Sequence, residues 1–278
     1  MLLRSLKIIA LCSPVLAACS SGSGEDASAA CTVPCASDAD GAAIAKTTRT
    51  LSTSGGLAGG LASADYDPIS GTFTITAPGL SAQMGRFPTA DYRDLLAMRD
   101  AAGVHNAYFG QGQGTRLVIY SGGMAGNVLN IASYGRTGPS EMPLSGTARF
   151  DGDYAGFTST RRINGKARLD VDFARETIEG RITERIFRQR PDNVVDVVNP
   201  LSTLVLEETS LSSDGSFQGV TGGGQIVNGQ ILWNPASGSF VGLIGGATGD
   251  EVVGTVAVTH RAPSGATFDE IGGFLATR

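Results

Sequence analysis

Residues 167–173 read Ala-Arg-Leu-Asp-Val-Asp-Phe, so apolar side chains at every second position alternate with charged ones. This period of two is typical of a strand with one face in a core and the other in water. It places Leu169, Val171 and Phe173 inside, and Arg168 and Asp170 outside. The segment that follows, 178–187, begins with the same alternation after a short connection. The two segments therefore predict an antiparallel hairpin.

The same signal continues from residue 143 to residue 278. Segments with strand character and turn residues between them occupy residues 146–157, 166–173, 178–187, 201–211, 215–220, 239–243, 252–260 and 267–276. Half-buried strands joined in sequence order favour an up-and-down barrel, because closing the sheet removes its exposed edges. We expect an eight-stranded antiparallel β-barrel over residues 143–278.

A smaller, strand-rich domain is predicted over residues 63–142. Its strands are expected at residues 72–76, 104–109, 116–120 and 128–134, and one short helix is expected at residues 89–101. Thr89 is a suitable N-cap for that helix, and Gly103 is a suitable stop. With 39 glycines and 17% charged residues, the composition agrees with a mainly all-β protein.

The N-terminus has the features of an export signal. Arg4 and Lys7 precede a short apolar run, and residues 16–19 read Leu-Ala-Ala-Cys. This pattern resembles the lipobox of bacterial lipoproteins, which implies cleavage after residue 18 and acyl chains such as palmitate on Cys19. An ordinary secretory signal is the alternative. Ser20 after the cysteine implies, by the same resemblance, a lipid anchor in the outer membrane of the cell envelope.

Residues 19–62 are rich in Ser, Gly, Ala and Asp and predict a flexible tether. Cys31 and Cys35 lie in it, and export favours a disulfide bond between them. A metal site and two unpaired thiols are the alternatives, although no histidine lies nearby.

From residue 135 onward the chain resembles the β-barrel domain of transferrin-binding-protein-B-like lipoproteins. The residues that carry the resemblance are Tyr134-Gly-Arg-Thr-Gly138, Pro143-Leu-Ser-Gly-Thr-Ala-Arg-Phe150, Asp153-Tyr-Ala-Gly156, Leu169-Asp-Val-Asp-Phe173, Ile178-Glu-Gly-Arg-Ile182, Gly215-Ser-Phe-Gln-Gly219, Gly238-Ser-Phe-Val-Gly242, Glu251-Val-Val-Gly254 and Gly272-Gly-Phe-Leu-Ala-Thr-Arg278. The resemblance implies a handle domain, a barrel and a lipidated cysteine. The sequence has room for one such lobe and lacks the long loops expected to contact transferrin.

Few residues are candidates for chemistry. His105 and His260 are the two histidines, and each is interpreted either as a packed residue or as a haem ligand. The arginines at 161, 162, 181, 185, 188 and 190 form either a basic patch or solvated strand ends. Trp233 is either a binding anchor or a barrel-rim residue.

Neither glycine-rich segment, at 112–114 or 222–224, opens a helix in a βαβ unit, so both are expected to be turns. Asp250 and Glu251 are adjacent, and on a strand they would face opposite sides. No serine belongs to a nucleophile motif. We therefore expect no catalytic residue, no metal and no cofactor.

The net charge of −5 does not fit a nucleic-acid partner. The sequence predicts a membrane-anchored, non-enzymatic binding or surface-interaction lipoprotein whose ligand is an unidentified protein or small molecule. A carrier of haem or another small ligand is one alternative, and an envelope structural protein is the other.

Overall fold

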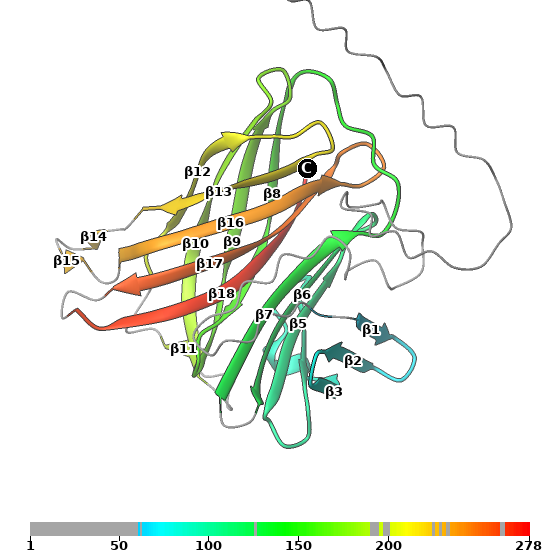
Figure 1. Cartoon of the computed structure of the whole chain (residues 1–278), viewed down its shortest axis with the longest axis vertical. Coiled ribbons are helices and arrows are strands. Elements are labelled where there is room, and N and C mark those ends of the chain that lie inside the picture. Colours follow the sequence, from blue (N-terminus) through cyan, green and yellow to red (C-terminus); the bar gives the residue numbers. More distant parts are fainter. Residues whose placement is uncertain are drawn as a thin grey trace, which may run out of the picture. The chain divides into compact units, whose positions relative to one another are not determined.

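The computed structural model describes residues 61, 63–124, 127–189, 195–196, 201–223, 226–227, 230–231, 234–261 and 265–278. Strands dominate these residues and form two main sheets (Figure 1). The handle sheet contains β1 (Ser63–Asp67), β2 (Thr72–Ala77), β3 (Leu80–Arg86), β4 (Leu96–Arg99), β5 (His105–Gln111), β6 (Thr115–Met124) and β7 (Asn127–Arg136). The barrel contains β8 (Thr147–Phe157), β9 (Arg161–Asp172), β10 (Thr177–Gln189), β12 (Leu204–Ser210), β13 (Ser216–Gly222), β16 (Asn234–Gly245), β17 (Glu251–Arg261) and β18 (Thr267–Thr277).

The barrel closes because its first strand, β8, pairs with both β9 and the last strand, β18. Every other barrel strand pairs antiparallel with its neighbours in the chain, as the sequence predicted. β11 (Val195–Asp196) adds a short pairing to β10, and β14 (Ile226–Val227) pairs with β15 (Gln230–Ile231). The predicted fold class, a handle followed by an eight-stranded barrel, is confirmed. The domain boundaries at residues 62 and 142 stay predictions.

The barrel interior is filled with apolar side chains. Leu169, Val171 and Phe173 are buried, whereas Arg168 and Asp170 lie on the outer face and remain partly accessible. The predicted inside and outside of this strand are therefore confirmed.

Large rings inside the barrel lie over glycines on the neighbouring strands. A Cβ atom at Gly242 would overlap the ring of Phe217, and one at Gly254 would overlap the ring of Phe274. These glycines serve packing, because only a residue without a side chain leaves room for the aromatic ring.

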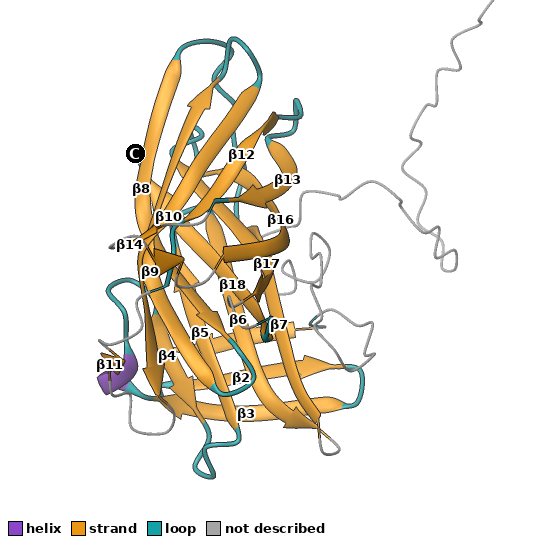
Figure 2. Ribbon diagram, turned by 90° about the vertical axis from the view of Figure 1, so that its left-hand side faces the viewer, coloured by secondary structure: helices purple, strands orange, loops and turns teal. Residues whose placement is uncertain are grey.

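The strands β4 to β7 of the handle are buried on both faces. Met98, Phe109 and Val118 point into a core within the handle, where residues of β2 and β3 cover them. The alternate positions on the same strands, such as Tyr108 and Leu117, pack against outward-facing side chains of β8 and of β16 to β18. The first core therefore lies within the handle, and the second joins the handle sheet to the outer wall of the barrel. Figure 2 shows β6 of the handle beside β18 of the barrel.

The helix predicted at residues 89–101 is wrong. The segment contains a single 3₁₀ turn, η2 (Pro88–Ala90), then a tight turn with Arg93 at φ 51°, and then β4. Because the sheet is covered on both faces here, residues 95–98 are apolar without alternation, and such a run resembles the face of a helix. In the described part of the chain, no helix is long and apolar enough to cross a membrane.

Candidate functional site

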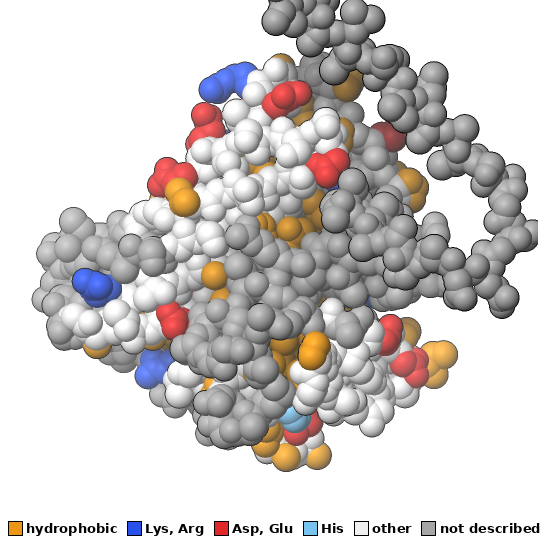
Figure 3. All heavy atoms as spheres, viewed as in Figure 1, with side chains coloured by type: hydrophobic (Ala, Val, Ile, Leu, Met, Phe, Trp, Pro, Cys, Tyr) orange, Lys and Arg blue, Asp and Glu red, His pale blue; other side chains and the backbone are white. Residues whose placement is uncertain are grey.

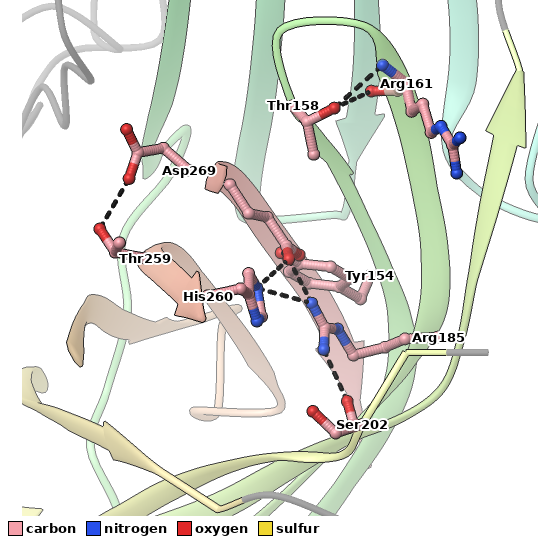
Figure 4. A network of polar contacts seen from close by, with 9 residues as sticks. Tyr154, Thr158, Arg161, Arg185, Ser202, Thr259, His260 and Asp269 are labelled. Atoms are coloured by element: carbon pink, nitrogen blue, oxygen red, sulfur yellow. Dashed lines mark hydrogen bonds and ion pairs between the residues drawn. The ribbon is translucent and has the colours of Figure 1, made fainter. Parts of the chain in front are cut away.

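A cluster of polar side chains lies inside the barrel, around the carboxylate of Glu270 on β18. Tyr154 on β8 donates its hydroxyl to Oε1 at 2.5 Å, and Nε2 of His260 on β17 lies 2.7 Å from Oε2. Nη2 of Arg185 on β10 contacts the same Oε2, and Nη1 donates to the carbonyl of Ser202 at 2.6 Å (Figure 4). The carboxylate thus binds side chains from three other strands.

Every ionisable member of this cluster is buried: the exposed fractions are 0% for Glu270, Tyr154 and His260, and 1% for Arg185. Burial by itself raises the pKa of Glu270, but Arg185, His260 and Tyr154 outweigh burial and lower this pKa to about 2. Burial, followed by the charge of Glu270, raises the pKa of Tyr154 well above its usual range. Glu270 is therefore an anion at neutral pH, and Tyr154 is a neutral donor.

A bulge in β10 brings Arg185 into the barrel. The pairing with β9 shifts between Thr183 and Ile186, and Glu184 within this irregularity has φ 52°. Before the bulge, Ile182 points inward; after it, Arg185 and Phe187 do so. The extra residue reverses the alternation, which is the usual effect of a bulge on side-chain direction.

This cluster is suited to holding strands together rather than to turnover. A general acid or base must reach a substrate, and these buried groups have no exposed surface. Three of its buried atoms, Nε of Arg185, Nδ1 of His260 and Oγ of Ser202, have no hydrogen-bond partner. The His260 ring also stacks on Phe268, with 4.5 Å between the ring centroids.

Sequence reasoning identified His260 but missed Glu270 and Tyr154. The signal was available for Glu270: it occupies an inward position of β18, two residues from Phe268 and two from Gly272. A charged residue on the apolar face of a predicted barrel strand requires a partner inside the barrel.

His105 lies elsewhere, at the start of β5 in the handle. Its Nδ1 lies 2.6 Å from the hydroxyl of Tyr120, and the two rings stack with centroids 6.0 Å apart. Burial, followed by the charge of Asp100, raises the pKa of Tyr120, so its phenol stays protonated. Both histidines thus have a polar partner, and the haem alternative stays a prediction.

The arginines that the sequence analysis considered together as a basic patch lie in different environments. Arg185 lies inside the barrel, Arg162 is 1% exposed on the outer wall, and Arg181 is exposed. A single basic patch is therefore wrong, and so is the view that all are solvated, because two of them are buried.

Glu251 binds the glycine-rich turn between β5 and β6. Its buried carboxylate accepts hydrogen bonds from the backbone N–H of Gln113 (2.5 Å), that of Gly114 (3.1 Å) and the hydroxyl of Thr115 (2.6 Å). A Cβ atom at Gly112 would overlap this carboxylate, which explains the glycine. The segment 112–114 is thus a turn, as predicted, and Glu251 holds it in place.

Several predicted site residues lie outside the described residues: Cys19, Cys31, Cys35, Trp233 and Arg190. Among the residues that are described, no group of His, Cys, Asp and Glu is arranged to hold a metal ion.

The fold is a handle sheet packed on the outside of a closed barrel, with polar clusters whose members bind one another. No protein-family model matches this chain, and no curated protein matches its sequence. Solved structures of transferrin-binding protein B do resemble it, as the sequence motifs had indicated.

A variant of that protein from Haemophilus parasuis has 13% identity and a TM-score of 0.45 over 73% of this chain. The isotype 1 protein from serogroup B Neisseria meningitidis has 14% identity and a TM-score of 0.44 over 79%. The match covers 40% and 41% of those two chains. This chain thus spans about two fifths of their length, and at TM-scores below 0.5 the likeness says nothing of what it binds.

Proposed function

We propose that this chain is a non-enzymatic binding lipoprotein of the bacterial cell envelope, anchored to the outer membrane by acyl chains on Cys19. The tether of residues 19–62 would let the handle and barrel stand away from the membrane and meet a protein or small-molecule ligand. The signal-like N-terminus supports the anchor, and the packed barrel interior supports recognition on the outer surface.

One observation carries the proposal of a binding surface. Of the large hydrophobic side chains exposed in the described residues, two belong to the same end of the handle sheet: Val104 (47% exposed) and Val128 (39%). The strand register places the β4–β5 turn and the start of β7 at this end, and the β1–β2 turn with Ile69 at the opposite end. Hydrophobic side chains are visible along the lower margin of the molecule in Figure 3.

Exposed apolar groups gathered at one end of a sheet are typical of an interaction surface. The end of the handle sheet that carries the β4–β5 turn and the start of β7 is therefore the part of the surface that we propose to contact the ligand. Polar groups that could perform chemistry, such as His260 and Glu270, are buried inside the barrel and would not reach a bound partner.

The anchor is tested by the variant Cys19→Ala. We expect the wild-type protein in the outer-membrane fraction and the variant in the soluble fraction. A variant that stays with the membrane, or a wild-type protein found in the inner membrane, would contradict the anchor.

The binding surface is tested by co-purification from membranes, followed by mass spectrometry, with the double variant Val104→Asp, Val128→Asp. Val220→Asp is the matched control, because Val220 is 63% exposed but lies on barrel strand β13. We expect the control to retain whatever molecule the wild-type protein retains, and the double variant to lose it. Equal retention by both variants would refute the surface.

A further inference from the structure

Three cations on the outer wall of the barrel are paired with carboxylates on neighbouring strands. Arg149 on β8 pairs with Asp170 on β9, at 2.7 Å. Lys166 and Arg168 on β9 pair with carboxylates of β10 and β8, each also at 2.7 Å. Opposite charges on facing strand positions stabilise a sheet, so this arrangement is expected.

Arg162 breaks this pattern. Its direct partner in the β9–β10 register is Arg188, and like charges at facing positions repel each other. Arg162 is only 1% exposed, and neither arginine forms an ion pair with a carboxylate among the described residues. Nη1 of Arg162 and Nε of Arg188 are buried and have no hydrogen-bond partner.

The handle covers Arg162 of this pair with the neutral side chains of Asn106 and Phe87, and a further cation lies on the same ring of Phe87. Asn106 on β5 accepts a hydrogen bond from Nη2 of Arg162 at 2.6 Å, and the residue facing Asn106 on β4 is Arg99. The ring of Phe87 lies 5.4 Å from Cζ of Arg162 and 5.2 Å from Cζ of Arg99, so both guanidinium groups contact one ring.

Burial and the neighbouring arginines both disfavour the charged form of Arg162. Burial lowers the pKa of Arg162; Tyr108 raises it, and the charges of Arg99 and Arg188 lower it further. An arginine nevertheless stays protonated in proteins. A buried, uncompensated cation is costly, so the site favours an anion that balances it.

We propose that Arg162 and Arg188, together with Arg99 and Asn106 of the handle, form a binding site for a small oxyanion such as phosphate or sulfate. The planar guanidinium group offers paired N–H donors that match two oxygens of such an ion. Because Arg162 is 1% exposed, the ligand has to be small. The site borders the β4–β5 turn, because Asn106 also donates its Nδ2–H to the carbonyl of Gly103 in that turn, at 3.3 Å.

The test is titration of the full chain with sodium phosphate and with sodium sulfate, by calorimetry and by thermal unfolding, against sodium chloride at equal ionic strength. The variant is Arg188→Gln, which keeps Arg162 and its bond to Asn106. Arg168→Gln is the matched control, because Arg168 lies on the same strand but is paired with Asp151.

We expect the wild-type protein and the control to bind phosphate or sulfate saturably, and to unfold at a higher temperature in that salt than in chloride. In Arg188→Gln the dissociation constant should rise about tenfold or more, as for the loss of one charge-assisted contact. In chloride the same variant should unfold at a temperature equal to or above that of the wild-type protein, since a repulsion is removed.

Sulfate and phosphate also stabilise proteins in general, by exclusion from their surfaces. An equal rise of the unfolding temperature in the wild-type protein, Arg188→Gln and Arg168→Gln would therefore be a general salt effect and would overturn the proposal. A calorimetric titration of the wild-type protein that shows no saturable heat of binding would overturn the proposal as well. If Arg188→Gln does not fold, Arg99→Gln is the second variant, and unchanged affinity in it would count against the site.

Discussion

The Glu270 cluster makes a prediction about stability that can be worked from the structure. Glu270→Gln keeps the volume of the side chain but removes the negative charge that pairs with Arg185 and His260 inside the barrel. Removing one partner of a buried ion pair leaves an uncompensated charge and costs about 3–5 kcal/mol. We expect the free energy of unfolding at pH 7 to fall by that amount.

The pKa of Glu270 leads independently to a similar figure. This pKa is lowered from 4.5 to about 2 in the folded protein. A lowered carboxyl pKa stabilises the folded state above the unfolded pKa, and this stability is lost as the pH falls through the folded pKa. At about 1.4 kcal/mol for each pKa unit, the contribution of Glu270 at neutral pH is about 3 kcal/mol. It should disappear between pH 4.5 and pH 2 in the wild-type protein and be missing in Glu270→Gln.

The assay is urea denaturation followed by far-ultraviolet circular dichroism at several pH values. Asp269→Asn is the control, because Asp269 is adjacent on β18 but bonds Thr259 near the surface. The double variant Glu270→Leu, Arg185→Met should be more stable than Glu270→Gln, since it removes both buried charges together. A double-mutant cycle then measures the coupling between Glu270 and Arg185.

Two results would refute this reasoning. One is a loss in Glu270→Gln no larger than in Asp269→Asn, which would mean that the carboxylate is not in a buried ion pair. The other is simple additivity of the Glu270 and Arg185 substitutions, which would mean that the two side chains do not interact in the folded protein.

Three further predictions concern packing, the tether and the handle. Phe173→Ala should lower the free energy of unfolding by about 3–5 kcal/mol, because it truncates a large buried side chain. Asp170→Ala, which removes one partner of an exposed ion pair, should lower it by about 0.5 kcal/mol or less. Equal losses for the two variants in chemical denaturation would contradict the barrel core. Cys31 and Cys35 should be bonded to each other, and non-reducing peptide mapping that finds both thiols free would exclude the bond. Glu251→Ala should expose the β5–β6 turn, so the backbone amides of residues 113 and 114 should exchange hydrogen faster, and unchanged exchange would show that the carboxylate does not hold the turn.

The barrel could be predicted from local signals because each of its strands has one face in the core and the other exposed to solvent. The alternation around Leu169, Val171 and Phe173 needs no knowledge of distant residues, and all eight barrel strands were expected at about the right places. The glycine-rich turn before Thr115 was also predicted correctly. The lipid anchor on Cys19 and the disulfide in the tether stay predictions, since they lie outside the described residues.

What the alternation could not reveal is the role of a residue whose environment comes from distant strands. β4 was taken for a helix because a strand covered on both faces has no alternation to detect. Arg185 was assigned with the surface arginines because one bulge at Glu184 reverses the direction of the residues after it.

The sequence by itself therefore determined the repeating strands, the closed barrel and the inward or outward direction of regular positions, since these follow from a local period of two. Only the tertiary structure decided which charged groups meet. Glu270 reaches Arg185 across the barrel interior, Arg162 is covered by the handle, and Glu251 binds a turn more than a hundred residues away. These contacts depend on which side chains meet across the barrel interior and on how the handle packs against the barrel, and no local pattern encodes either one.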